Sequence, residues 1–209
     1  MLPQFREPDA SEAEANLRMI RELMERSTRH STFSGMSGVL AGIASILGCL
    51  VTYALGRQHF SPRYYQSAFL LTWSIVIVAA IGMDYLLTKR QATQVGKHIV
   101  SRLGKQMLLA IVPGLGTGAL LTLFFRQQTL IPEAFLADVF PVWMLCYGIS
   151  VCSVGTFSQP EVSYLGVAFL LAGAATLLLF PHFGLAMMAL TFGGFHIAYG
   201  LLVARKDGW

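Results

Sequence analysis

Charged residues are scarce in this chain of 209 residues. Asp, Glu, Lys and Arg make up 12% of the sequence and apolar residues 55%, whereas soluble domains contain about 25% charged residues. So little charge cannot cover the surface of a water-soluble globule. The scarcity excludes a single soluble domain and predicts an all-α fold, a polytopic transmembrane helical bundle.

Cysteine is scarce as well, with three residues and no C-x-x-C pair. This excludes a disulfide-rich secreted protein and gives no zinc or redox motif. No H-E-x-x-H or G-x-S-x-G motif occurs, and no paired aspartates of an intramembrane protease. Only His196 among the histidines falls inside a predicted span, so two axial haem ligands at one depth are missing. We therefore expect no enzyme, no bound metal and no cofactor.

Long stretches almost free of charge provide the membrane spans. A bilayer core takes about 20 apolar residues in a helix. A breaker and a turn residue, Pro181 and Gly184, divide the last such stretch into a hairpin. The predicted spans are 34–55, 66–88, 106–126, 133–153, 162–180 and 184–203. Residues 1–33 then form an amino-terminal region, 34–203 the transmembrane domain and 204–209 a short tail.

The basic residues predict the orientation. With an even number of spans both termini lie on one side, and twelve of the fifteen Lys and Arg residues fall there. The other side holds Arg57, Arg63 and Arg126. Since Lys and Arg in short loops stay in the cytoplasm, both termini are predicted to be cytoplasmic. The net charge of +4 thus reflects the basic residues on the predicted cytoplasmic side. A nucleic-acid partner is not expected, because the basic residues border spans.

The amino-terminal region has the pattern of an amphipathic helix. Leu17, Ile20, Leu23 and Met24 share one side of such a helix, and acidic residues precede basic ones by four positions. Three placements are open for it: on the inner leaflet, on a partner protein, or as a cap on the cytoplasmic face of the bundle.

The first span carries a seam of small residues on one helix face. Its members are Gly35, Gly38, Gly42, Ser45 and Cys49. Small residues let helix backbones approach closely in lipid. The seam is expected to pack within the chain, with Gly193 and Gly194 of the last span as the complementary surface. A homo-oligomer or a membrane-protein partner bound through this seam is the alternative.

The third span contains three glycines after a proline, from Pro113 to Gly118. No Gly-Lys-Ser/Thr follows, so a phosphate-binding loop is not indicated. A broken helix of the kind that lines transporter sites is one interpretation. A kinked but continuous helix whose glycines admit neighbours is the other, and we expect it.

Ionisable residues within spans are the candidate functional groups, because burying a charge at mid-helix costs about 2.5–3.5 kcal/mol even on lenient scales. Asp84 and His196 are predicted at similar depths in the inner leaflet. They are either a proton-sensitive or substrate-binding pair, or an interfacial aspartate and a hydrogen-bonded packing histidine. Asp138, at the other end of its span, is expected to reach the lipid headgroups.

Both ends of the chain show a likeness to known sequences. The entry MERSTR followed by FSGMSGVLAG and the closing stretch GGFHIAYG resemble a family of small bacterial integral membrane proteins of unknown function. The resemblance implies a six-span bundle in a bacterial inner membrane and a genomic association with regulators, with no assigned activity. His196 and Tyr199 match the closing pattern of that family.

From these features we expect a non-enzymatic structural, sensory or partner-binding membrane component. The alternative is a small-solute or proton-coupled transporter or channel that uses Asp84 and His196. A membrane-embedded enzyme comes third, because its catalytic residues are missing.

Overall fold

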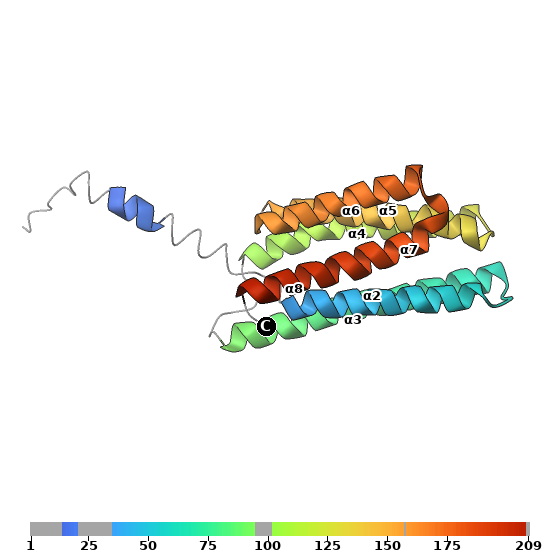
Figure 1. The fold of residues 1–209 in the computed structure, drawn as a ribbon, viewed down its shortest axis with the longest axis horizontal. Helices are drawn as coiled ribbons and strands as arrows, with labels where there is room; N and C mark the ends of the chain where they lie inside the picture. The colour runs from blue at the N-terminus through green and yellow to red at the C-terminus, as the bar shows by residue number, and fades with distance from the viewer. Residues whose placement is uncertain (1–13, 21–34, 95–101, 157, 208–209) are drawn as a thin grey trace, which may run out of the picture.

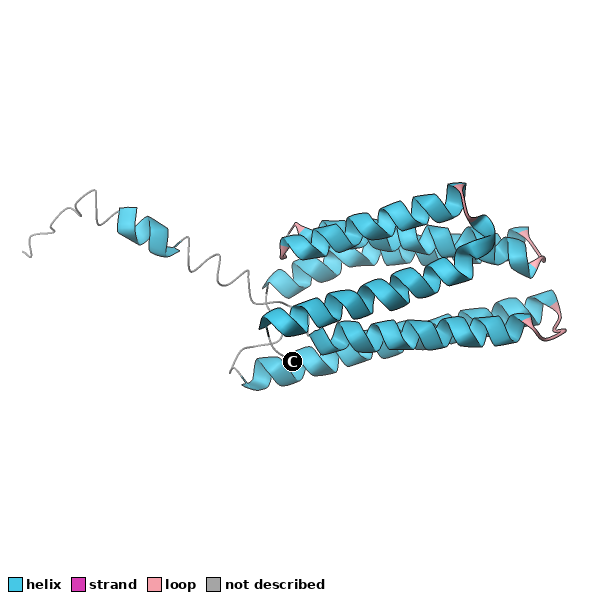
Figure 2. Cartoon of the chain, in the orientation of Figure 1, coloured by secondary structure: helices cyan, strands magenta, loops and turns pink. Residues whose placement is uncertain are grey.

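The computed structural model describes residues 14–20, 35–94, 102–156 and 158–207. Helices make up nearly all of this part, and it contains no strand (Figures 1 and 2). The long helices are α2 (Gly35–Gly56), α3 (Pro62–Gln94), α4 (Arg102–Gln128), α5 (Pro132–Gly155) and α6 (Pro160–Leu178). After a short 3-10 turn η1 (Pro181–Phe183), one long rod runs through α7 (Gly184–Met188), the π-helical segment η2 (Ala189–Phe195) and α8 (His196–Asp207). The predicted all-α bundle is confirmed.

Six helices are long and apolar enough to cross a membrane, within the described residues. Large apolar side chains cover their outer surface, with Leu109 72% and Val78 70% exposed, as lipid contact requires. The protein is therefore an integral membrane protein. The second helix is longer than predicted, because it starts at Pro62 and continues to Gln94. The fifth helix ends at Leu178, and the amide groups of Leu179 and Phe180 donate to the Ala175 carbonyl just before Pro181.

The helices form two groups of three. The first group contains α2, α3 and the rod α7–η2–α8, and the second contains α4, α5 and α6. In Figure 1 the first and last spans, α2 and α8, run side by side. We call the end of the bundle that holds Gly35 and Asp207 the proximal end. The distal end is the one at which 57–61, 129–131 and 179–180 connect the helices.

Glycines set the close approach of α2 to the last rod. A methyl group on Gly42 would lie 2.6 Å from the carbonyl oxygen of Gly193, and one on Gly35 would lie 2.6 Å from that of Gly200. Gly38 faces the backbone of Gly200 at 3.1 Å. Backbones this close leave no room for side chains, so van der Waals contact between them holds the pair in lipid.

This contact decides between the two expectations for the small-residue seam. The last rod covers Gly35, Gly38 and Gly42, so these glycines do not offer a surface to a second chain or a partner. Gly193 belongs to the complementary surface, whereas Gly194 faces Leu190 of its own helix. Ser45 and Cys49 of the seam are buried too. The structure thus agrees with packing of the seam within the chain and gives no support for a partner bound through it.

Glycines also bring the helices of the second group close together. A methyl group on Gly148 of α5 would lie 3.0 Å from the carbonyl oxygen of Gly166 in α6, and Gly155 faces Ser163. Gly114 of α4 faces Ser150 of α5, whose hydroxyl donates to the Ile111 carbonyl at 3.2 Å. Helix α4 is continuous through Pro113, as expected, and its glycines Gly114 and Gly118 pack on α5, whereas Gly116 faces open space.

The two groups meet through large side chains in the distal half. A buried cluster joins Phe69 and Trp73 of α3 to Phe135 and Phe140 of α5, with Phe69 and Phe135 edge to face at 5.3 Å. At the distal end Gln66, which is fully buried, donates to the Thr129 carbonyl at 2.8 Å. Aromatic contacts and hydrogen bonds therefore fasten α3 to the second group there.

The amino-terminal region is described only over 14–20, which is helical. Leu17 and Ile20 are 66% and 53% exposed. The other residues of the predicted amphipathic helix, Leu23 and Met24 among them, lie outside the described residues.

Alanine substitution at two glycines separates packing from helix propensity. We expect Gly42→Ala to lower the free energy of unfolding by about 1–3 kcal/mol, because its methyl group meets the Gly193 carbonyl. Gly116→Ala is the matched control, since nothing lies within 4 Å of its added methyl group. Thermal unfolding in mild detergent should show a lower midpoint for the first variant alone. Equal midpoints would contradict the packing role of Gly42.

Candidate functional site

Asp84 lies on α3 and is held by the neighbouring helix. The Ser37 hydroxyl of α2 donates to its carboxylate Oδ1 at 2.8 Å. The aspartate is half-buried, within the proximal half of the bundle. A carboxylate that accepts a hydroxyl proton between two helices faces the bundle interior, as intramembrane carboxylates usually do.

His196 lies at the first position of α8 and is surrounded by aromatic rings. Its ring stacks on Phe192 with centroids 5.8 Å apart and meets Phe169 of α6 edge-on at 5.5 Å. Its Nε2 atom shares a hydrogen bond of 2.7 Å with the Tyr147 hydroxyl of α5, in which the histidine tautomer decides the donor. This hydrogen bond crosses from the first helix group to the second.

The other ring nitrogen of His196 has no hydrogen bond. Its Nδ1 atom is buried and unsatisfied, although the backbone carbonyl groups of Thr191 and Phe192 lie close to it. An unsatisfied polar atom costs several kcal/mol in a medium without water. The two carbonyl groups reduce this cost, so the imidazole is held less completely than a fully hydrogen-bonded buried group.

Tyr147 links the two sequence-predicted residues. It bonds directly to His196, and both Asp84 and Tyr199 are close enough to act on its hydroxyl electrostatically. Asp84 and His196 themselves form no hydrogen bond. We call Ser37, Asp84, Tyr147, His196 and Tyr199 the polar cluster. It draws on α2, α3, α5 and α8, and Tyr199 also packs on the small apolar core around Val151.

The π-helical segment directly precedes His196. A π turn holds one residue more than an α turn and leaves backbone carbonyl groups poorly paired. The Thr191 hydroxyl donates to the Met187 carbonyl at 2.8 Å, which compensates part of this loss. The segment keeps Gly193 against α2 while turning His196 toward Tyr147 and Phe169. π-helical turns often occur at functional sites.

Asp138 is separate from the polar cluster. It lies in the distal half of α5, about one and a half turns from Pro132, and is half-buried. It forms no hydrogen bond or ion pair with any described residue. Its position beside the distal end agrees with an aspartate that reaches the headgroups.

Tyr147 and Ser37 were not found by sequence reasoning. Both are uncharged, and neither belongs to a motif. The sequence does not say which helices are neighbours, so it could not show that these two side chains face Asp84 and His196. Among the described residues, no group of three His, Cys, Asp or Glu side chains stands together as a metal site.

A repeated hairpin was also missed, and the sequence does carry a signal for it. Gly48, Thr52, Pro62 and Trp73 recur 70 positions later as Gly118, Thr122, Pro132 and Trp143. The equivalent residues make equivalent contacts in the hairpins α2–α3 and α4–α5. The indole of each tryptophan donates to its threonine, at 3.2 Å and 2.8 Å, and its ring faces its glycine.

Comparison of the chain with protein families, curated proteins and solved structures gives no match. The resemblance to bacterial six-span membrane proteins stays a prediction, and the site is interpreted from its own geometry.

A double-mutant cycle tests the contact across the helix groups. We expect Tyr147→Phe and His196→Ala to couple by about 1 kcal/mol in unfolding free energy, because they share one hydrogen bond within the span. The matched cycle of Asp84→Asn with His196→Ala should couple less, since these two side chains do not touch. Thermal or denaturant unfolding in detergent gives both values. Additive effects in the first cycle would contradict the hydrogen bond.

Proposed function

We propose that this protein is a non-enzymatic membrane component of a sensory kind. In this proposal the two helix groups stay joined at the distal end and separate at the proximal end when the polar cluster takes up a proton. The observation that carries it is the hydrogen bond of 2.7 Å between Tyr147 and His196, an ionisable contact between the two groups.

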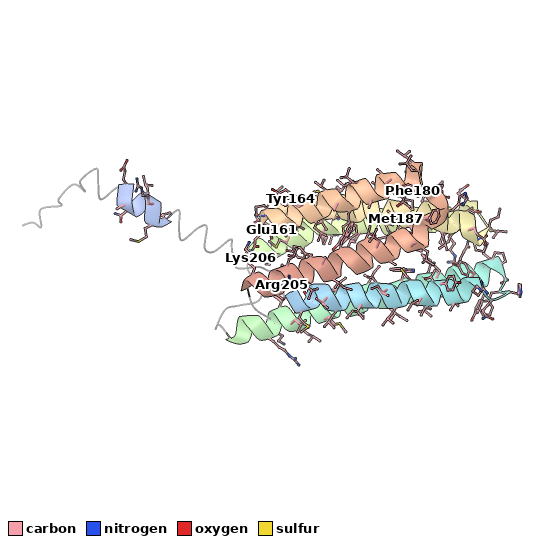
Figure 3. The ribbon with its side chains drawn as sticks, viewed as in Figure 1. Glu161, Tyr164, Phe180, Met187, Arg205 and Lys206 are labelled. Carbon is pink, nitrogen blue, oxygen red and sulfur yellow. The ribbon has the colours of Figure 1, made fainter. Side chains whose placement is uncertain are left out.

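The uneven packing between the groups supports this motion. Close approaches across the boundary involve η1, α7 and η2, whereas α8 packs closely on α2 and η2. At the proximal helix ends an exposed ion pair joins the groups, Lys206 Nζ to Glu161 Oε1 at 2.7 Å (Figure 3), and Tyr199 of α8 packs on the apolar core around Val151. Exposed ion pairs contribute little free energy. The proximal half is therefore the easier half to open.

Protonation of His196 favours the open state for a physical reason. A charged imidazolium between Phe169 and Phe192 lies in a poorly solvated place, and water that enters between the groups would relieve the cost. Of the other titratable groups in the polar cluster, Tyr147 shares the hydrogen bond with His196, while Asp84 on α3 and Tyr199 on α8 act electrostatically on the Tyr147 hydroxyl. Acid thus weakens the contact between α8 and α5.

The orientation of the protein in the membrane decides on which side the helix groups would separate. We infer that the protein resides in a bacterial inner membrane with both termini in the cytoplasm, from the distribution of its basic residues and from the family resemblance. The proximal end then faces the cytoplasm, on the same side as the amino-terminal region. A cytoplasmic partner would therefore detect the separation of the two helix groups at the proximal end.

Transport is the second candidate function, and two observations favour it. The polar cluster contains Asp84 and His196 within the spans, where ionisable residues mark ion and substrate pathways. The repeated hairpin is also typical of transporters built from internal repeats. Proteoliposomes with a trapped pH dye distinguish the functions: proton flux that Asp84→Asn abolishes supports transport, and an acid-induced opening without flux supports sensing.

Spin labels test the opening directly. In a variant whose native cysteines are alanine, Tyr164→Cys and Leu202→Cys place labels on exposed positions of α6 and α8. Acidification from pH 8 to pH 5 should lengthen the distance between these labels, measured by pulsed electron spin resonance in nanodiscs.

A distal label pair serves as the matched control. Leu177→Cys and Leu190→Cys also span the two groups, on the distal side, and their distance should not change with pH. In the His196→Gln background the proximal distance should become independent of pH. A proximal distance that is constant in the parent protein, or that changes equally in His196→Gln, would overturn the proposal.

A further inference from the structure

Two arginines come together at the distal end, away from the polar cluster. Arg63, in the first turn of α3, donates from Nη1 to the backbone carbonyl of Arg126 in the last turn of α4, at 2.6 Å. Arg126 donates in return from Nη2 to the Ser67 hydroxyl of α3, at 2.9 Å. Two guanidinium groups from different helices are thus fixed in one small region.

A buried side chain holds this arrangement in place. Gln66 is fully buried, and both ends of its amide are used. Its Nε2 donates to the Thr129 carbonyl at 2.8 Å, and its Oε1 accepts from Arg63 at 3.5 Å. The first turn of α3 is therefore locked to the end of α4, and the positions of both arginines follow from that lock.

Among the described residues, no acidic side chain forms an ion pair with either arginine. The ion pair found among the described residues lies at the opposite end, between Lys206 and Glu161. Glu133, in the first turn of α5, is exposed and forms no ion pair with either arginine. Each guanidinium has five N–H donors, of which the observed hydrogen bonds use a minority. The region offers unused donors and two uncompensated positive charges.

The depth of the pair indicates the ligand. Arg63 and Arg126 lie at helix ends, and the exposed rings of Phe60 and Tyr64, which are close to Arg63 in the sequence, pack together with centroids 4.6 Å apart. Aromatic residues at span ends mark the headgroup layer of the membrane. Guanidinium groups bind phosphate oxygens in a bidentate manner that fits this charge and donor geometry.

We propose that Arg63 and Arg126 form a binding site for a phosphate group, supplied by the headgroup of a membrane phospholipid. The site is independent of the proposed sensory function, because it shares no residue with the polar cluster. A free phosphate ion has the same chemistry and is the other source of the ligand. By its location the site would also strengthen the fastening of α3 to α4 at the distal end.

Native mass spectrometry of the full chain in mild detergent tests the site. The probes are dioleoyl phosphatidylglycerol, dioleoylglycerol, which lacks the phosphate, and inorganic phosphate. The parent protein should retain the phospholipid on the order of tenfold more tightly than the double variant Arg63→Gln/Arg126→Gln. Arg63→Lys/Arg126→Lys keeps both charges but loses the bidentate fork, so it should bind with intermediate affinity.

The controls separate the possible sources and a general charge effect. Arg57→Gln removes one charge from the connection between α2 and α3 and should bind as the parent does. Competition by millimolar inorganic phosphate would assign the site to free phosphate, and its absence to the lipid headgroup. Equal retention by the parent and the double glutamine variant, equal retention of dioleoylglycerol, or an equal loss in Arg57→Gln would overturn the proposal. Circular dichroism checks that each variant is folded.

Discussion

The close approach of α2 to the last rod is the contact on which the rest of the bundle depends. Lipid tails are as apolar as the side chains, so helices in a membrane gain little from hydrophobic burial and associate through packing instead. At Gly35, Gly42 and Gly193 the backbones themselves touch. This pairing makes the first and last spans neighbours, and α3 and the rod then flank α2. The chain between them forms a second group, α4–α6, which packs against the first.

Different side chains hold the helices within the groups and between them. Within each group glycines bring backbones together, as at Gly148 and Gly166, and a tryptophan donates to a threonine on the adjacent helix. Between the groups the contacts include large rings, such as Phe69 on Phe135 in the distal half and Phe169 on His196 nearer the middle of the bundle. Backbone contact admits one register, whereas ring contacts can adjust. The boundary between the groups therefore depends on contacts between side chains, rather than on the touching backbones found within each group.

The spans could be predicted from the sequence, because charged residues are costly in lipid and each span is therefore a nearly uncharged stretch. The sequence was also sufficient for the face of α2 that packs, since five small residues share it. It did not reveal that Gly200 is a partner of this face, or that a π-helical segment precedes His196, because both depend on the register between distant helices. Asp84 and His196 were found because an ionisable side chain within a span is costly. Tyr147 could not be, because a tyrosine within a span costs little and gives no signal until its neighbour is known.

Hydroxyl groups show why the contact of Tyr147 with His196 is unusual here. Most serine and threonine hydroxyls in the spans donate to a carbonyl one turn back in their own helix, as Thr52 does to Gly48 and Thr122 to Gly118. They are satisfied without a neighbour, which suits a medium that offers no water. His196 is not, since its Nδ1 is unsatisfied and its Nε2 depends on the other helix group. Apolar rings of similar volume often replace buried polar pairs with no loss of stability. Packing alone therefore does not account for an imidazole at this boundary.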